Sequence, residues 1–228
     1  MAWRCSGHTN ADLIANMHAA RIITSERVKE AMTKVDRANY VLHKSEAYED
    51  SPQSIGHSAT ISAPHMANIF FLGISNASNI PSCKRVLDVG SGSGYLCAVL
   101  HHLVPGGVVV GIDHIPELVD WSKGNLRKDG LGSALDKGEI IMVAGDGRQG
   151  YSDLAPYDAI HVGAAAPKLP HQLVDQLKSP GRMFIPVGTF TQEILQVDKD
   201  KSGNVTKKEL MGVMYVPLTD AERQKSGR

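Results

Sequence analysis

The 228-residue sequence has few cysteines and no long apolar run. Its three cysteines are odd in number, scattered and without a C-x-x-C pair, which argues against a disulfide framework and against a zinc site. The N-terminal residues contain no apolar core of a secretory signal, and no apolar stretch approaches the ~20 residues of a membrane-spanning helix. We therefore expect a cytosolic protein without a bound metal and without a membrane partner.

An excess of charge is also missing, because 24 Lys and Arg balance 24 Asp and Glu. Proteins that bind nucleic acids usually carry a basic face that neutralises phosphates, so this balance argues against a nucleic-acid partner. Hydrophobic residues make up 42% of the chain, which is enough for a substantial core. At this length we expect one domain, acting as a monomer.

The first part of the chain predicts three helices and one long loop. Apolar residues recur at helical spacing over residues 10–22 and 25–36. Residues 38–63 are mainly polar and indicate a loop, and a loop of that length inside a compact domain is usually functional. Pro64 suits the first turn of a third helix over residues 64–75.

From about residue 84, short apolar segments alternate with amphipathic ones. Alternation of this kind is typical of βαβ units and of a parallel sheet covered on both faces. We expect strands at residues 85–90, 107–113, 139–146, 157–163 and 181–188, and helices at 94–104, 115–129 and 170–178. Residues 192–218 read as an antiparallel hairpin at the sheet edge. The predicted fold is a doubly wound, Rossmann-like α/β domain with N-terminal helices and a C-terminal β-hairpin.

The stretch VLDVGSGSGYL (residues 86–96) places three glycines between a strand and a helix. Such a turn lets backbone N–H groups approach a ligand closely. A dinucleotide fingerprint would need its third glycine one residue after Gly94, and the chain has no Gly-Lys-hydroxyl run of a phosphate loop. The spacing from Asp88 to Gly94 instead resembles the first motif of the S-adenosylmethionine-dependent methyltransferases.

Three aspartates follow three successive predicted strands, at the sheet edge where such folds bind ligands. The resemblance implies S-adenosyl-L-methionine as cofactor and S-adenosyl-L-homocysteine as product. Asp88 would meet the ammonium group of the cofactor directly or through water. Asp113 would accept hydrogen bonds from the ribose hydroxyls, and Asp146 would contact the adenine amino group.

The stretch SATISAPHMA (residues 58–67) is rich in hydroxyls and has no charged residue. A carboxylate that accepts a methyl group is already an anion at neutral pH, because its ordinary pKa is around 4, so it needs no general base. The site has to position the carboxylate and remove part of its water, and a neighbouring Lys or Arg would reduce its nucleophilicity. The hydroxyls of Thr60 and Ser62 therefore favour a carboxyl acceptor. His161, on a predicted buried strand, is expected to be a core histidine with a backbone partner.

Longer stretches carry a closer resemblance, to the protein-L-isoaspartate (D-aspartate) O-methyltransferases. They are DSPQSIGHSATISAPHMA, LDVGSGSGYL, GIDHIPELV, GDGRQGY, APYDAIHVGAAAP and GVMYVPLTD. The resemblance implies methylation of the free carboxyl of L-isoaspartyl and D-aspartyl residues in damaged proteins and peptides. The ester would then close to a succinimide that reopens partly to normal aspartate, which begins repair.

The resemblance also implies the roles of individual residues. Ser62 would be catalytic. The residues implied for the cofactor are Ala59, Thr60, Ile61, Ser62, Asp88, Gly90, Ser91, Gly92, Asp113, His114, Asp146, Gly147, Thr219 and Gln224. Those implied for the substrate are Thr60, Ser62, His65, Tyr215, Val216, Pro217 and Leu218, with the backbone of MYVPL pairing with the peptide like a strand. Ala67 departs from the family, whose members often have a histidine there.

The expected single domain, residues 1–228, divides into three parts. Residues 1–82 would form the helical and substrate-loop region, 83–190 the cofactor-binding core, and 191–228 the hairpin and tail.

Residues 198–209 match the spacing of an EF-hand calcium loop. An EF-hand needs an amphipathic helix on each side, and the flanking segments read as strands. We therefore expect a polar turn instead. Two other functions stay open: a methyltransferase of this fold that acts on a small molecule or nucleic acid, and a non-catalytic, calcium-responsive binding module.

Overall fold

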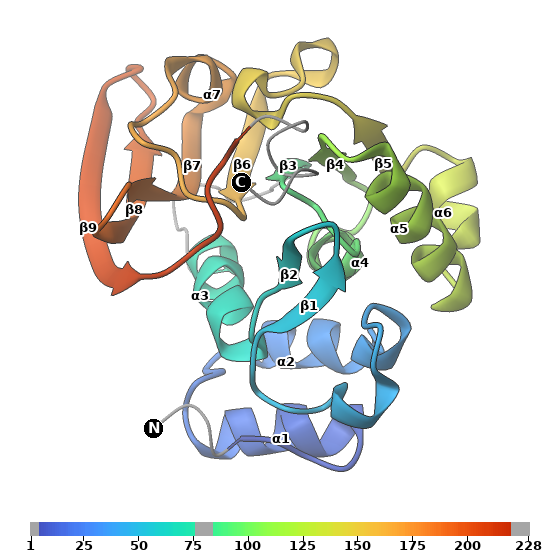
Figure 1. The fold of residues 1–228 in the computed structure, drawn as a ribbon. Helices are drawn as coiled ribbons and strands as arrows, with labels where there is room; N and C mark the ends of the chain where they lie inside the picture. Colours follow the sequence, from blue (N-terminus) through green and yellow to red (C-terminus); the bar gives the residue numbers. More distant parts are fainter. Residues whose placement is uncertain (1–4, 76–83, 220–228) are drawn as a thin grey trace.

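The computed structural model describes residues 5–75 and 84–219 (Figure 1). The helices are α1 (Asn10–Ala19), α2 (Glu26–Thr33), α3 (Pro64–Ser75), α4 (Tyr95–Leu103), α5 (Pro116–Lys128), α6 (Gly132–Asp136) and α7 (His171–Asp175). The strands are β1 (Gln53–Gly56), β2 (Ala59–Ile61), β3 (Arg85–Val89), β4 (Val108–Asp113), β5 (Ile140–Ala144), β6 (Tyr157–Val162), β7 (Leu177–Gly188), β8 (Gln192–Lys199) and β9 (Val205–Val213).

The central sheet has the strand order β5-β4-β3-β6-β7-β8-β9. Strands β5, β4, β3, β6 and β7 are parallel, and β8 and β9 extend the sheet in antiparallel fashion. The chain moves outward from β3 to β4 and β5 and then crosses back to β6, so the switch point lies at the end of β3. The predicted Rossmann-like fold with a C-terminal hairpin is confirmed.

The sheet separates two hydrophobic cores, because neighbouring side chains of a strand point to opposite faces. Val86 and Val109 pack on one face with helices α1 to α5, while Leu87 and Val110 pack on the other with α7. All four side chains are fully buried. Figure 1 shows α1 and α2 stacked below α3 and α4, on the side of hairpin β1–β2. The N-terminal helices therefore support the segment that precedes Pro64.

The expected loop over residues 38–63 is more structured than predicted. It contains an antiparallel hairpin in which Gln53 pairs with Ile61. His57 and Ser58 form its turn with left-handed backbone angles, φ 51° and 55°. Because such turns usually carry Asn-Gly or Asp-Gly, the His-Ser pair gives no hairpin signal in the sequence.

Two further expectations near the sheet edge have different outcomes. The helix expected over residues 170–178 ends at Asp175, and β7 begins at Leu177 rather than at residue 181. The polar turn expected in place of a calcium loop is confirmed, since β8 and β9 flank it as strands. Asp200 Oδ1 accepts hydrogen bonds from the backbone N–H groups of Ser202 (2.8 Å) and Asn204 (2.9 Å), which fixes the turn.

In the two described ranges, no helix is long and apolar enough to span a membrane.

Candidate active site

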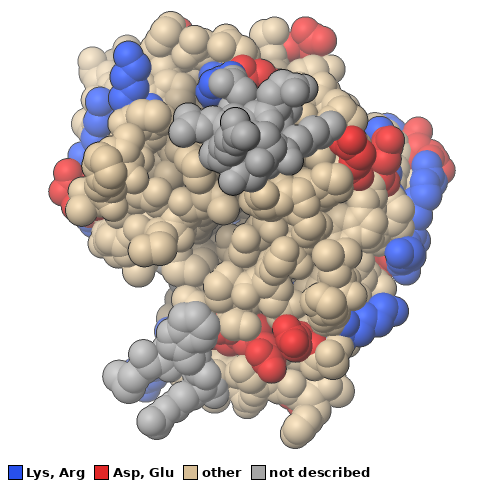
Figure 2. Space-filling view, viewed as in Figure 1, with Lys and Arg blue, Asp and Glu red and all other residues tan. Residues whose placement is uncertain are grey.

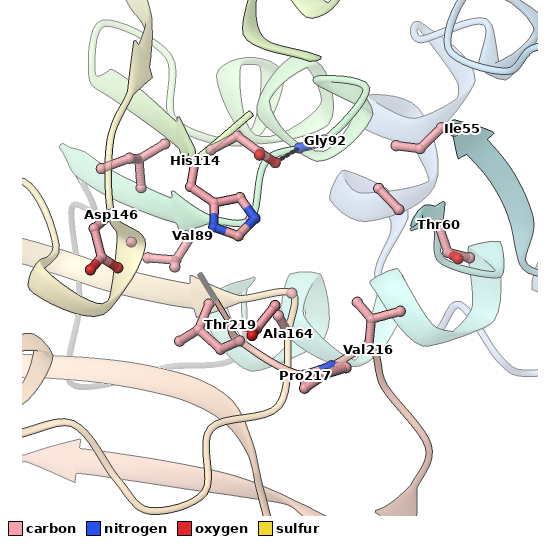
Figure 3. Close-up of a pocket in the computed structure, with 17 residues that line it drawn as sticks. Ile55, Thr60, Val89, Gly92, His114, Asp146, Ala164, Val216, Pro217 and Thr219 are labelled. Atoms are coloured by element: carbon pink, nitrogen blue, oxygen red, sulfur yellow. Dashed lines mark hydrogen bonds between the residues drawn. The ribbon is translucent and has the colours of Figure 1, made fainter. Parts of the chain in front are cut away.

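Three adjoining cavities lie where the parallel strands end. The carboxylate cavity is lined by Gly90, Asp113, Asp146 and Thr219, among others. Figure 3 shows Asp146 on one side of it, with Ile55 and Thr60 of hairpin β1–β2 opposite. The histidine cavity contains Asp88 and His161, and the outer cavity contains Ser62, His65 and residues 211–216. Strands from the sheet and the hairpin before α3 thus meet around one continuous site.

The glycine loop after β3 forms one wall shared by the carboxylate and histidine cavities. Gly90, Gly92 and Gly94 all have left-handed φ angles, 77°, 50° and 84°. An L side chain rarely adopts this conformation, so the alternating glycines are required by the backbone path. The backbone amide of Gly92 donates to Asp113 Oδ2 at 3.0 Å, the dashed line in Figure 3.

Asp113 ends β4 and is 7% exposed. Its Oδ1 accepts from the amide of Ile115 at 3.0 Å, so each carboxyl oxygen already has one backbone donor. Burial raises the pKa of Asp113, against the lowering effect of these two hydrogen bonds. Each oxygen keeps a further lone pair that can receive a ligand hydroxyl.

Asp146 follows β5 and is held differently. Arg148 approaches its carboxylate side-on, with Nη2 to Oδ2 at 2.9 Å and Nε to Oδ1 at 2.9 Å. These hydrogen bonds lower the pKa of Asp146. The carboxylate is thus oriented and ionised at the rim of the cavity.

Asp88 is only 1% exposed, and its carboxylate is engaged by protein groups. His161 Nδ1 lies 2.7 Å from Oδ1, and the Cys97 thiol donates to Oδ2 at 3.3 Å. An ionised carboxylate only accepts, so Nδ1 carries the proton. The expectation of a backbone partner for His161 is therefore wrong. The sequence hid this pairing because the two residues lie 73 positions apart on adjacent strands.

The outer cavity is lined mainly by apolar residues, and Thr60, Ser62 and Tyr215 are its hydroxyl-bearing residues. The side chains of Ser62 and Tyr215 share a hydrogen bond, and burial raises the pKa of Tyr215. Gln192 brackets the backbone of Tyr215: its Oε1 accepts from the amide at 2.6 Å, and its Nε2 donates to the carbonyl at 3.1 Å. The segment after β9 is thereby fixed beside Ser62, which lines the same cavity.

Thr60 and Gly163 line all three cavities. They mark the junction at which the ligands of the separate cavities would meet. Among the described residues that line the cavities there is no Lys or Arg. In Figure 2 the centre of this face is tan, without Lys or Arg, and Asp and Glu side chains gather below it.

The sequence-predicted site residues gather here with one exception, since Gln224 lies outside the described residues. Their individual roles stay predictions. Sequence reasoning missed Gly163 and Ile55 and placed His161 in the core. Gly163 could have been found from its position, because it directly follows the strand that pairs with β3. In the described ranges, no group of three or more His, Cys, Asp or Glu residues could hold a metal ion.

Comparisons with known proteins agree over nearly the whole chain. The family model of protein-L-isoaspartate(D-aspartate) O-methyltransferase (PCMT) matches residues 8–223. Protein-L-isoaspartate O-methyltransferase 1 of Arabidopsis thaliana is 46% identical over 219 residues, covering 96% of this chain and 94% of the relative. The protein-L-isoaspartate O-methyltransferase of Caenorhabditis elegans is 45% identical, and 98% of each chain is covered.

A solved structure adds an independent comparison. The crystal structure of a Plasmodium falciparum protein of this name, in complex with S-adenosyl-L-homocysteine, has a TM-score of 0.85 and 31% identity. The match covers 93% of this chain and 99% of that one. Together with the glycine loop and the strand-end carboxylates, these matches show that the chain belongs to the protein-L-isoaspartate (D-aspartate) O-methyltransferase family.

Proposed function

We propose that this protein transfers a methyl group from S-adenosyl-L-methionine to the free carboxyl of L-isoaspartyl and D-aspartyl residues in damaged proteins and peptides. The ester then closes to a succinimide, and repair begins. Beside the family membership, one observation carries the proposal: a carboxylate-bearing cavity and an uncharged, hydroxyl-bearing cavity meet at Thr60 and Gly163.

The residues of the first two cavities fit the cofactor. S-adenosyl-L-methionine supplies an electrophilic methyl on a sulfonium. Asp113 would receive the ribose hydroxyls, and Asp146, which lines the same cavity, would contact the adenine. Asp88 is almost fully buried, so little of its carboxylate can contact the cofactor. It would stabilise the ammonium group together with His161, which lines the same cavity.

The outer cavity fits a carboxylate acceptor. Ser62 and Thr60 offer neutral hydroxyls, and no Lys or Arg among the described residues lines this cavity to hold the acceptor too tightly. The acceptor needs no proton removed, so the site has to align it and exclude water. The lack of Lys and Arg among the described lining residues also weakens the alternative of a nucleic-acid acceptor.

The tail offers the substrate less free backbone than the sequence indicated. Gln192 engages Tyr215, while the Val216 carbonyl and the Leu218 amide bond to Ala165 at 2.8 Å each. Among the described residues, the Val216 amide has no partner. Strand-like recognition of the peptide would therefore use Met214 and Val216, rather than the whole MYVPL segment.

We further propose an oligomeric state, a location and a division of the chain. The protein would act as a monomer in the cytosol, without nucleic-acid or membrane partners. Residues 1–82 would supply the substrate loop, 83–190 the cofactor core and 191–228 the hairpin and tail.

Methyl transfer from labelled S-adenosyl-L-methionine to two versions of one short peptide tests the function. One peptide carries isoaspartate and the other aspartate at the same position, so the pair differs only in its backbone connection. We expect label on the isoaspartyl peptide alone, released by mild base as carboxyl methyl esters are. Label that resists base, or equal labelling of both peptides, would contradict the proposal.

A further inference from the structure

Arg37 is a buried cation close to the proposed site. It lies in the short 3-10 turn Arg37–Asn39, and its side chain is 0% exposed. Arginine is almost never fully buried unless it is paired, because removing a charge from water is costly. No ion pair of Arg37 with a carboxylate occurs within residues 5–75 and 84–219. A buried charge of this kind calls for a structural reason.

The guanidinium group ties together the two ends of hairpin β1–β2. Its Nη2 donates to the carbonyl oxygen of Ser62 at 3.0 Å and to that of Ser51 at 3.4 Å. Ser51 precedes the hairpin and Ser62 follows it. One nitrogen thus fixes the hairpin base, from which Thr60 reaches the junction of the cavities.

The same group rests on the cofactor side of the site. Its central carbon lies 5.3 Å from the ring centroid of Tyr95, the residue that follows Gly94 and begins α4. Burial lowers the pKa of Arg37 to about 10, so the group is still charged at neutral pH and can make a cation–π contact. Arg37 therefore contacts both the carbonyl of Ser62 and the ring of Tyr95, which begins α4.

The turn that carries Arg37 is itself anchored. Asn39 Nδ2 donates to Asp129 Oδ1 at 2.7 Å, and the Tyr40 hydroxyl donates to Asp129 Oδ2 at 2.9 Å. Asp129 caps the end of α5, which packs on the sheet. The guanidinium thus projects from a fixed base toward Ser62.

We propose that Arg37 is a positioning residue that holds Ser62 in register with the glycine loop, so that the acceptor carboxyl and the methyl group align. This inference rests on the proposed function. Arg37 acts through the Ser62 backbone and lines none of the three cavities. Its planar group bonds and stacks at once, which the single ammonium of a lysine does not do.

The first test compares Arg37→Lys and Arg37→Met with Arg182→Lys and Arg182→Met. Arg182 also bonds a backbone carbonyl, that of Gly73, but lies away from the cavities. We expect kcat/KM for the isoaspartyl peptide to fall about 10- to 100-fold in both Arg37 variants, since a misplacement of about 1 Å costs that much. The affinity for S-adenosyl-L-homocysteine, measured by calorimetry, should stay unchanged. The Arg182 variants should keep kcat/KM.

A double-mutant cycle separates positioning from general destabilisation. If Arg37 acts by placing the Ser62 hydroxyl, Arg37→Lys should lower kcat much less in the Ser62→Ala background than in the wild type. Equal losses in both backgrounds would overturn the proposal. So would an equal loss of cofactor affinity and turnover in Arg37→Lys.

Hydrogen–deuterium exchange keeps the inference distinct from the proposed function, because it needs no turnover. Amides of residues 59–63 should exchange faster in Arg37→Lys than in the wild type, with exchange in β3 unchanged. Unaltered exchange at residues 59–63 would overturn the role of Arg37 even if the enzyme methylates isoaspartyl peptides. A wild type that methylates no isoaspartyl peptide, but shows this exchange difference, would overturn the function alone.

Discussion

The two halves of the site are built by different means. On the cofactor side, carboxylates and glycines sit at the ends of parallel strands, and backbone hydrogen bonds such as Gly92 to Asp113 hold them. On the acceptor side, a short hairpin and the segment after β9 carry neutral hydroxyls. Side chains from distant elements hold these two segments: Arg37 holds the Ser62 carbonyl, and Gln192 brackets Tyr215.

This difference follows from what each half has to do. A charged cofactor with many polar groups is recognised by fixed charges and dipoles, which a sheet edge supplies directly. A carboxylate nucleophile needs alignment without strong hydrogen bonds from cations, so the positive charge of Arg37 is placed behind the backbone. Cofactor affinity and acceptor turnover should therefore respond to different substitutions.

The largest expected effect is on the cofactor side. Asp113→Ala should weaken binding of S-adenosyl-L-homocysteine by about 2 kcal/mol, since hydrogen bonds to charged groups contribute about 1.5–3 kcal/mol. Asp113→Asn keeps one acceptor oxygen and should lose less. At saturating cofactor, peptide KM should be unchanged in both. Normal cofactor affinity with lost peptide turnover would reverse the assignment.

Gly163→Ala should affect the cofactor side and the acceptor side of the site together. An added Cβ would lie 3.2 Å from the Gly90 carbonyl oxygen at the junction, and crowding of this kind costs about 1–3 kcal/mol. We expect cofactor affinity and peptide turnover to fall together. Gly124→Ala is the matched control, because a Cβ there has no neighbour within 4 Å and a helical alanine should stabilise α5. A fall in cofactor affinity alone, or in peptide turnover alone, would contradict the placement of Gly163 at the junction.

Ser62→Ala should lower turnover without changing cofactor affinity. Removal of one neutral hydroxyl should lower kcat up to about tenfold, in line with the ~0.5–1.5 kcal/mol of an ordinary hydrogen bond. Calorimetric affinity for S-adenosyl-L-homocysteine should not change. The exposed Ser54 of the same hairpin lines none of the three cavities, so Ser54→Ala serves as a control. Equal losses of affinity and turnover in Ser62→Ala would remove its proposed role.

A smaller effect concerns pH. The ribose hydroxyls would donate to the ionised Asp113, so S-adenosyl-L-homocysteine affinity should fall as the pH drops through the raised pKa of this group, above the ordinary Asp value. In the ligand-free protein, the contribution of Asp113 to folding stability changes with pH in the opposite direction. There a raised pKa means that the folded state binds the proton more readily, so this group adds stability as the pH falls. An Asp113→Asn variant with the same pH dependence of affinity would assign it to another group.

The sequence located the strand-end carboxylates and the glycines of the cofactor half because these signals are local, but it missed the pairing of Asp88 with His161, which lie 73 positions apart. Strand periodicity and the spacing from Asp88 to Gly94 lie within short windows, and parallel strands bring their ends to one edge. The acceptor half depends on contacts across the chain. Arg37 reaches Ser62 over 25 positions, and Gln192 brackets the backbone of Tyr215 over 23. Hairpin β1–β2 escaped prediction because its turn residues adopt left-handed angles that their types do not indicate.

The most direct test of this division is a crystal structure with S-adenosyl-L-homocysteine and an isoaspartyl peptide bound together. We expect the cofactor sulfur to lie beside Thr60 and Gly163, facing the free carboxyl of the peptide. That carboxyl would lie in the outer cavity, within hydrogen-bond distance of Ser62. A peptide carboxyl that approaches the sulfur from outside this cavity, or that contacts a Lys or Arg side chain there, would contradict it.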